Sequence, residues 1–168
     1  LSEHTDRVNS ASWSPDGSKI TTASYDRTAK IWDVTTGALL LTLAGHKDKV
    51  YHVAWSPDGS KIATAGPDFT TKIWNAASGA LLFTLAGHTD VIRHIEWNPD
   101  GSKIATASDD FTAKIWNITT GTLLFTLTGH TYIIYHVVWS PDGSKLATAS
   151  VDRTAKIWDA ASGAMLVT

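Results

Sequence analysis

The stretch that decides the fold runs from Gly45 to Asn75 and reads GHKDKVYHVAWSPDGSKIATAGPDFTTKIWN. Short apolar and β-branched runs alternate with turn residues, and the 3.6-residue spacing of a helix is absent. The run from Val50 to Trp55 predicts a strand that ends at a Ser-Pro-Asp-Gly turn, in which proline presets φ and glycine supplies a positive φ. Three further strands are predicted at 61–65, 70–74 and 80–85, which gives an antiparallel meander of four strands.

The same unit occurs four times, with a period of 42 residues that accounts for all 168 residues. Two tryptophans and a histidine mark each period: Trp13, Trp55, Trp97 and Trp139; Trp32, Trp74, Trp116 and Trp158; His4, His46, His88 and His130. The repeats are 1–42, 43–84, 85–126 and 127–168, with no linker and no second domain. One such sheet cannot cover both of its apolar faces, whereas blades packed around an axis can. We therefore predict an all-β propeller array of four four-stranded antiparallel blades. A double-sheet sandwich gives no reason for four near-identical meanders.

The landmarks of each period resemble those of the WD40-repeat family. In the second period they are Gly45-His46, the Trp55-Ser-Pro-Asp-Gly59 turn and Ile73-Trp74-Asn75. The dipeptide that ends this pattern is Trp-Asp in repeats one and four and Trp-Asn in repeats two and three. The resemblance covers the whole chain and implies a β-propeller that serves as a non-catalytic scaffold for protein or peptide partners.

Composition narrows the class of function. Hydrophobic residues make up 43% of the chain and charged residues 18%, as expected of a globular protein. The net charge of −2 argues against a nucleic-acid partner, which requires a basic surface. There is no cysteine, so the chain has no disulfide framework, no thiolate metal site and no cysteine nucleophile.

No apolar run is long enough for a membrane helix, and the chain starts at Leu1 without a signal peptide. We therefore expect an excised or engineered segment with no membrane partner, for which a cytoplasmic location is the default.

Each repeat carries a histidine, a threonine, an aspartate and a tryptophan at fixed offsets, which we call a tetrad. The tetrads are His4, Thr22, Asp26 and Trp32; His46, Thr64, Asp68 and Trp74; His88, Thr106, Asp110 and Trp116; His130, Thr148, Asp152 and Trp158. A hydroxyl, an imidazole and a carboxylate together suggest a hydrolase, but a catalytic set is needed once and this one occurs four times. The WD40 resemblance instead implies a buried hydrogen-bond network within each blade. In repeat one Glu3 replaces the glycine before the histidine and Thr21 replaces an alanine, so we expect a frayed network there.

Positions that differ between repeats are free to contact a partner. Three offsets vary most: three and five residues after the tetrad histidine, and one residue before the tetrad aspartate. The resemblance puts these offsets on one rim of the ring, beside the channel, where the family contacts its partners. We predict a partner-binding rim made of Arg7, Asn9, Tyr25, Lys49, Tyr51, Arg93, Asp109, Tyr132, Ile133, Tyr135 and Val151. Tyrosine and arginine are enriched in binding hot spots. The best candidate for the partner contact is the apolar group of repeat four, made of Tyr132, Ile133, Tyr135 and Val151. Its alternative role is packing against a neighbouring blade.

Histidine recurs six residues after the tetrad histidine, at His52, His94 and His136, with Ser10 in repeat one. If they lined the channel of a closed dimer, six imidazoles would suggest metal or anion capture. No carboxylate has matching spacing, and Glu96 is the only acid in that strand. We therefore expect the histidines to pack against adjacent turns, and we predict no metal and no cofactor.

Four repeats leave the outer faces of the first and last blades bare. A closed four-bladed ring needs about 90° per blade, against about 45 to 51° in the seven- and eight-bladed rings that these repeats resemble. We therefore predict a homodimer in which two chains form an eight-bladed ring with two-fold symmetry. The alternatives are an engineered or excised half-propeller that has no ligand and only self-assembles, and, more remotely, a hydrolase.

Overall fold

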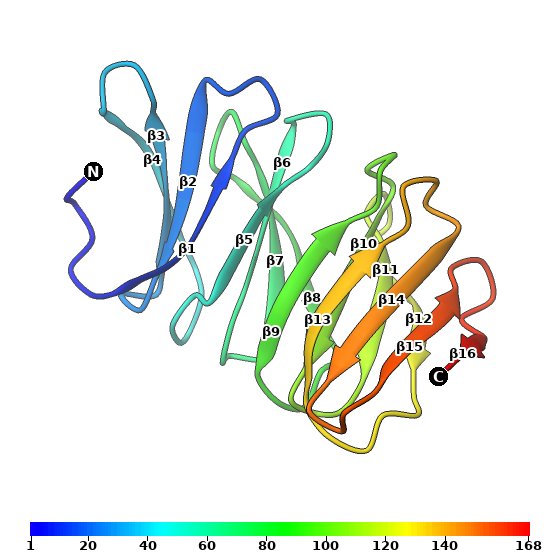
Figure 1. Ribbon diagram of the computed structural model, residues 1–168. Coiled ribbons are helices and arrows are strands. Elements are labelled where there is room, and N and C mark those ends of the chain that lie inside the picture. Colours follow the sequence, from blue (N-terminus) through cyan, green and yellow to red (C-terminus); the bar gives the residue numbers. More distant parts are fainter.

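The computed structural model describes residues 1–168 and contains strands and turns. Its strands form four separate four-stranded antiparallel sheets, or blades, each made of consecutive strands that we name a to d in chain order (Figure 1). Blade one contains β1 (Val8–Trp13), β2 (Lys19–Ser24), β3 (Thr28–Asp33) and β4 (Leu39–Ala44). Blade two contains β5 (His52–Trp55), β6 (Lys61–Ala65), β7 (Thr70–Asn75) and β8 (Leu81–Ala86). Blade three contains β9 (Ile92–Trp97), β10 (Lys103–Ser108), β11 (Ala113–Asn117) and β12 (Thr122–Leu127). Blade four contains β13 (Ile134–Trp139), β14 (Lys145–Ser150), β15 (Ala155–Asp159) and β16 (Met165–Val167). The chain has no helix of the length and apolarity that crossing a membrane requires.

Blade two follows the strands predicted from the second repeat closely. β6 has the predicted bounds, β7 and β8 differ by one residue, and β5 begins at His52 rather than at Val50. The later start arises because the Val50 N–H donates to Ser24 O of blade one, at 2.9 Å, instead of joining its own sheet. Gly59 has a φ of 69°, as the a–b turn requires. In blades one to three, strand d runs one or two residues past the 42-residue division.

The core lies between the blades. The inner strands β1, β5, β9 and β13 are neighbours in space, and the sheets extend outward from them side by side (Figure 1). At the junction of blades one and two, Val50, Val53 and Trp55 pack in one buried cluster with Ala23 and Ile31 of blade one. The same offsets form the clusters at the other two junctions. Each blade therefore covers one face of its neighbour, and this packing stabilises a repeat array.

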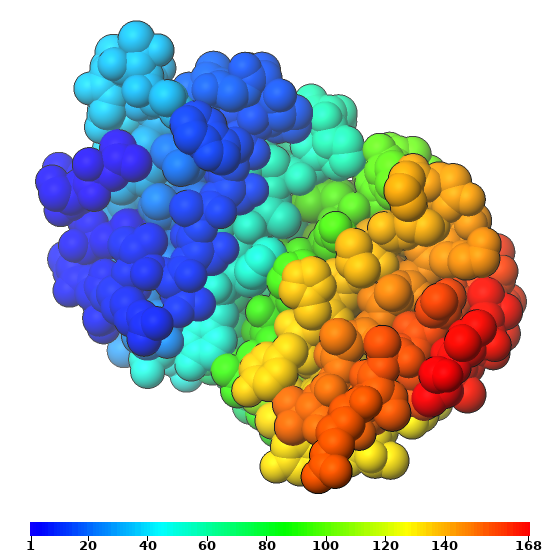
Figure 2. Space-filling model, in the orientation of Figure 1, coloured from blue at the N-terminus to red at the C-terminus, as the bar shows by residue number.

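The two ends of the array are uncovered. Val8 and Trp13 of blade one are 47% and 58% exposed, whereas their counterparts Val50 and Trp55 are 0% and 9% exposed. At the other end Ile157 is exposed, although its counterparts in the other three blades are fully buried. The first and last blades lie on opposite sides of the molecule (Figures 1 and 2). The four blades therefore form an open array and do not close into a ring by themselves.

Candidate functional site

The structure brings the four residues of each tetrad together in a buried network. In blade two, His46 Nδ1 donates to Asp68 Oδ2 at 2.8 Å, and His46 Nε2 lies 2.7 Å from Thr64 Oγ1. The Trp74 Nε1–H donates to Thr64 Oγ1 at 2.8 Å. Because the carboxylate fixes the proton on Nδ1, the Thr64 hydroxyl donates to Nε2 and accepts from the indole. The hydroxyl and both ring nitrogens of the tetrad are thereby satisfied.

The other three tetrads repeat this geometry. The distance from histidine Nδ1 to aspartate is 2.7 Å in each, and the distance from Nε2 to threonine is 2.7 or 2.8 Å. The indole nitrogen donates to the threonine at 2.8 to 3.1 Å. The expectation of a frayed network in repeat one is wrong, because His4 and Asp26 make the same bonds. The Thr5 N–H also donates to Asp26 Oδ2, at 3.2 Å, and ties the first loop to the blade.

Burial and hydrogen bonding set the charges within the tetrads. Burial alone would raise the pKa of Asp68, but hydrogen bonds from His46 and nearby donors hold that pKa well below its ordinary value. The pKa of Asp110 is lowered in the same way. Burial lowers the pKa of His88, although the bond from its own ring to Asp110 opposes the shift. At neutral pH the third tetrad therefore pairs a charged aspartate with a neutral histidine.

The order hydroxyl, imidazole, carboxylate is that of a nucleophilic triad, but its surroundings differ from those of an active site. Thr64, Thr106 and Thr148 are at most 1% exposed, so their hydroxyls do not face solvent. Each of these oxygens also accepts the indole N–H of its tetrad. The hydrogen bonds of a tetrad can link four segments of one blade to one another. These segments are the loop before strand a, strand b, the b–c turn and strand c.

The predicted rim residues of blades one and two form a group of aromatic and cationic side chains. The rings of Tyr25 and Tyr51 lie 5.4 Å apart, one from each blade. Arg7 and Lys49 approach the Tyr25 ring, with the Arg7 guanidinium carbon at 5.4 Å and the Lys49 ammonium at 4.8 Å from its centroid. Asn9 Nδ2 donates to Tyr51 O at 2.9 Å. These side chains therefore link the two blades at the rim.

Arg93 extends this group into blades three and four. Its guanidinium carbon lies 5.8 Å from the centroid of Tyr51 and 5.7 Å from that of Tyr135. Asp109 accepts two hydrogen bonds from Arg93 Nε, at 2.8 and 3.0 Å, and a further one from Nη2, which orients the guanidinium. We call the continuous group made of Arg7, Tyr25, Lys49, Tyr51, Arg93 and Tyr135 the rim belt.

The apolar group of blade four lies partly outside the rim belt. Tyr132 and Val151 are exposed and Ile133 is half-buried. The Tyr132 ring stacks on Phe111 of blade three at 5.5 Å, and the Val151 N–H donates to Ile133 O at 2.9 Å. Phe111 was absent from the sequence-based set, because its offset, directly after the tetrad aspartate, was not among the three compared.

The histidine rings of the inner strands lie against one another in tilted pairs. The ring centroids of His52 and His94 are 4.3 Å apart, and those of His94 and His136 are 3.8 Å apart. The expectation of packing against adjacent turns missed these ring contacts, which arise because the inner strands bring equivalent residues of neighbouring blades together. Burial, with a smaller effect of neighbouring imidazoles, lowers the pKa of His52 to about 4 and that of His94 to about 3. No group of three or more histidine, aspartate or glutamate side chains is arranged to hold a metal ion.

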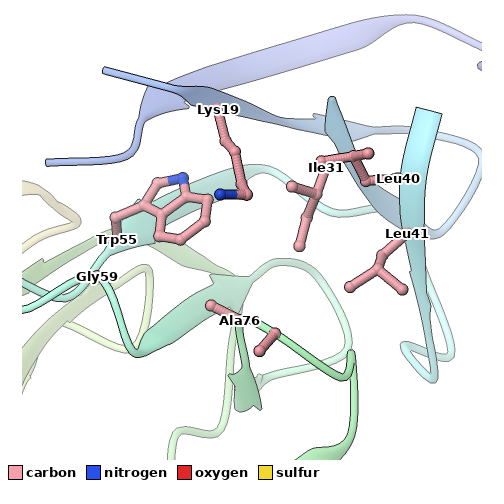
Figure 3. Close-up of a pocket in the computed structure, with 8 residues that line it drawn as sticks. Lys19, Ile31, Leu40, Leu41, Trp55, Gly59 and Ala76 are labelled. Atoms are coloured by element: carbon pink, nitrogen blue, oxygen red, sulfur yellow. The ribbon is translucent and has the colours of Figure 1, made fainter. Parts of the chain in front are cut away.

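A cavity of about 440 Å³ between blades one and two was not predicted from the sequence (Figure 3). Its lining includes Lys19, Ile31, Leu40, Leu41, Trp55 and Ala76. A comparison of the repeats contains a signal for this cavity, because the smaller Leu41 stands where repeats two and three have Phe83 and Phe125. This offset was not among those compared, since it lies in strand d, away from the rim.

Comparison with known proteins agrees with this architecture. The family model described as "WD domain, G-beta repeat" matches residues 1–33, 37–75, 79–117 and 121–159. The chain is also similar to periodic tryptophan protein 2 of Saccharomyces cerevisiae (strain ATCC 204508 / S288c), with 51% identity over 39 residues. That similarity covers 23% of this chain and only 4% of the yeast protein, which corresponds to about one repeat.

Proposed function

Because this chain belongs to the WD40-repeat family, we propose that it is a non-catalytic scaffold that binds a protein or peptide through the rim belt. The observation that carries this proposal is that side chains at the most variable offsets meet in one continuous group across all four blades. Tyrosine and arginine supply large contact areas and are enriched among residues that dominate binding energy. The ion pair between Arg93 and Asp109 orients a cation in the middle of the rim belt, which favours a preformed surface.

Ring closure by a second copy is part of the same proposal. The bare face of blade one carries Val8, Ala11 and Trp13, which repeat the buried set Val50, Val53 and Trp55. The bare face of blade four carries Ala149, Ile157 and Val167, which repeat Ala23, Ile31 and Leu41 on the other side of an internal junction. Each end is therefore one half of a junction that the chain already forms three times. Two chains joined end to end give eight blades with two-fold symmetry.

The glycines of the turns support this assignment of the ends. A Cβ added at Gly59, Gly101 or Gly143 would lie 3.5 to 3.6 Å from a proline of the preceding blade. The equivalent Gly17 of blade one has no atom within 4 Å, as expected if its neighbouring proline belongs to another chain.

A second candidate function is self-assembly alone, without a ligand. The bare end faces favour it, since they account for ring formation without requiring any contact at the rim. The two candidates differ only in what the rim belt does.

The rim belt is tested by selecting peptides from a displayed library on the wild-type protein and measuring the affinity of the selected peptides for Tyr25→Ala and Tyr135→Ala. We expect at least a tenfold loss of affinity, with melting temperatures within a few degrees of wild type, because both residues are exposed or half-buried. Thr120→Ala, in the c–d turn at the opposite end of blade three, is the matched control. If no peptide is selected, or if selected peptides bind the rim variants unchanged, the scaffold proposal fails and self-assembly remains.

A further inference from the structure

The cavity between blades one and two lies at the end of the blades opposite to the rim belt. Its walls come from the start of strand b and strands c and d of blade one, and from the end of strand a and the a–b and c–d turns of blade two (Figure 3). Ile31, Leu41 and Ala76 form apolar walls, while Lys19 brings an ammonium group. Its volume of about 440 Å³ falls within the range of small-molecule sites.

This cavity exists because one side chain, that of Leu41, is smaller here than its counterparts at the two neighbouring junctions. Phe83 occupies the equivalent place between blades two and three, where a Cβ on Gly121 would lie 2.6 Å from its ring. Phe125 does the same between blades three and four. At the first junction Leu41 leaves the corresponding atoms at 3.7 Å from a Cβ on Gly79. Neither of the other two junctions opens a comparable cavity.

A tryptophan of the cavity wall, Trp55, has a buried hydrogen-bond donor without a partner. Trp97 Nε1 donates to Ala54 O and Trp139 Nε1 donates to Glu96 O, both at 3.2 Å, across their junctions. Trp55 Nε1 is buried and has no such partner. Leaving a buried N–H unsatisfied is unfavourable, so the protein gains when a ligand supplies an acceptor. In Figure 3 the indole nitrogen lies on the side of the ring that faces Lys19.

The Lys19 ammonium is available to an anion. Its one hydrogen bond is to Ser18 Oγ, at 3.3 Å, and no carboxylate lies within ion-pair distance of it, although the charges of Asp16 and Asp33 act on it from farther away. Asp16 and Asp58 line an adjoining hollow and are both charged, but their oxygens accept hydrogen bonds from serines of their own turns, Ser14 and Ser18 for Asp16 and Ser56 and Ser60 for Asp58. A ligand with a single negative charge at one end therefore meets Lys19 with its head and the apolar walls with its body.

We propose that this cavity binds a small aliphatic carboxylate, with its carboxylate on Lys19 and Trp55 Nε1 and its chain against Ile31, Leu41 and Ala76. The site is separate from the rim belt, at the other end of the strands. It therefore neither requires nor excludes the scaffold function.

The experiment is calorimetric titration of the protein with sodium octanoate. Leu41→Phe fills the cavity with the side chain that the next two junctions already accommodate, and we expect at least a tenfold loss of octanoate affinity with folding retained. Phe83→Leu is the matched control at the second junction and leaves the affinity of the first site unchanged. We expect Lys19→Gln to weaken the binding of octanoate but not the binding of octanol, which has the same chain and a neutral head.

A second measurement keeps the proposal testable if Leu41→Phe does not fold. In ¹H–¹⁵N spectra of the wild-type protein, octanoate shifts the indole resonance of Trp55, assigned by its loss in Trp55→Phe, and leaves that of Trp97 in place. The proposal is overturned if octanoate does not bind at millimolar concentration. It is also overturned if Leu41→Phe binds as well as wild type, or if the Trp55 resonance does not move. Equal binding of octanol and octanoate would contradict the role of Lys19.

Discussion

Substitution of Asp68 by alanine removes the carboxylate at one end of the hydrogen-bond chain of the second tetrad. The carboxylate accepts from His46 Nδ1 at 2.8 Å, from the Lys47 N–H at 3.0 Å, and from the backbone and hydroxyl of Thr70 at 3.1 and 2.8 Å. It also holds the b–c turn, in which Phe69 has a φ of 62° that a non-glycine residue rarely adopts. The substitution therefore leaves a buried imidazole without its acceptor and removes the hydrogen bonds that hold the b–c turn in this unfavourable conformation.

An unsatisfied buried donor costs about 1 to 3 kcal/mol, so we expect Asp68→Ala to lower the free energy of unfolding by roughly 2 to 4 kcal/mol. The assay is urea denaturation at pH 7, read as a lower midpoint at unchanged m-value. Asp48→Ala is the control, since Asp48 is exposed and accepts only the Lys49 N–H; its cost is expected within about 0.5 kcal/mol. Equal midpoints for Asp68→Ala and wild type would refute the account of the tetrads as structural networks.

The other predictions concern the remaining networks, pH and the seam. Asp110→Ala is expected to cost about as much as Asp68→Ala in the same assay, because its tetrad has the same bonds; a cost below that of the Asp48 control would contradict this. Lowering the pH from 6.5 to 5 is expected to destabilise the protein, because unfolded histidine binds a proton near pH 6.5 whereas the pKa of His94 is about 3 in the fold. The expected loss of unfolding free energy is roughly 2 kcal/mol, and His94→Ser, which introduces the residue found at the equivalent Ser10 of blade one, reduces this loss. An unchanged pH dependence of stability in that variant would contradict the role of His94. Trp13→Arg is expected to leave the chain folded but monomeric in size-exclusion chromatography, since Trp13 is 58% exposed on the bare face of blade one; a variant that still dimerises would exclude this face from the seam.

The parts of the structure that repeat could be predicted from the sequence. The Trp55 turn and most strand bounds of blade two follow from spacing that recurs four times, whereas the proximity of His46 to Asp68 was implied by the resemblance to the WD40-repeat family. A feature common to every blade is determined by interactions within one blade or between identical neighbours. Local periodicity and turn chemistry therefore carry enough information to predict it.

The features that depend on differences between neighbouring blades were harder to predict. Arg93 was expected on the rim, but the position of its guanidinium between Tyr51 and Tyr135 of the two flanking blades is a geometry that no single repeat encodes. Likewise, the cavity arises where Leu41 faces Ala76 across a junction, and neither residue is unusual in its own strand. Such features require the distance between two sheets, which sequence patterns within one sheet do not give.

The measurement that tests the central claim most directly is the mass of the protein in solution, determined by light scattering across a range of concentrations. The bare end faces predict a compact species of twice the chain mass of 18.1 kDa, persisting to low micromolar concentration. A mass of 18.1 kDa at the highest concentration would contradict closure by a second copy, and a ladder of larger species would show that the blades do not close at eight.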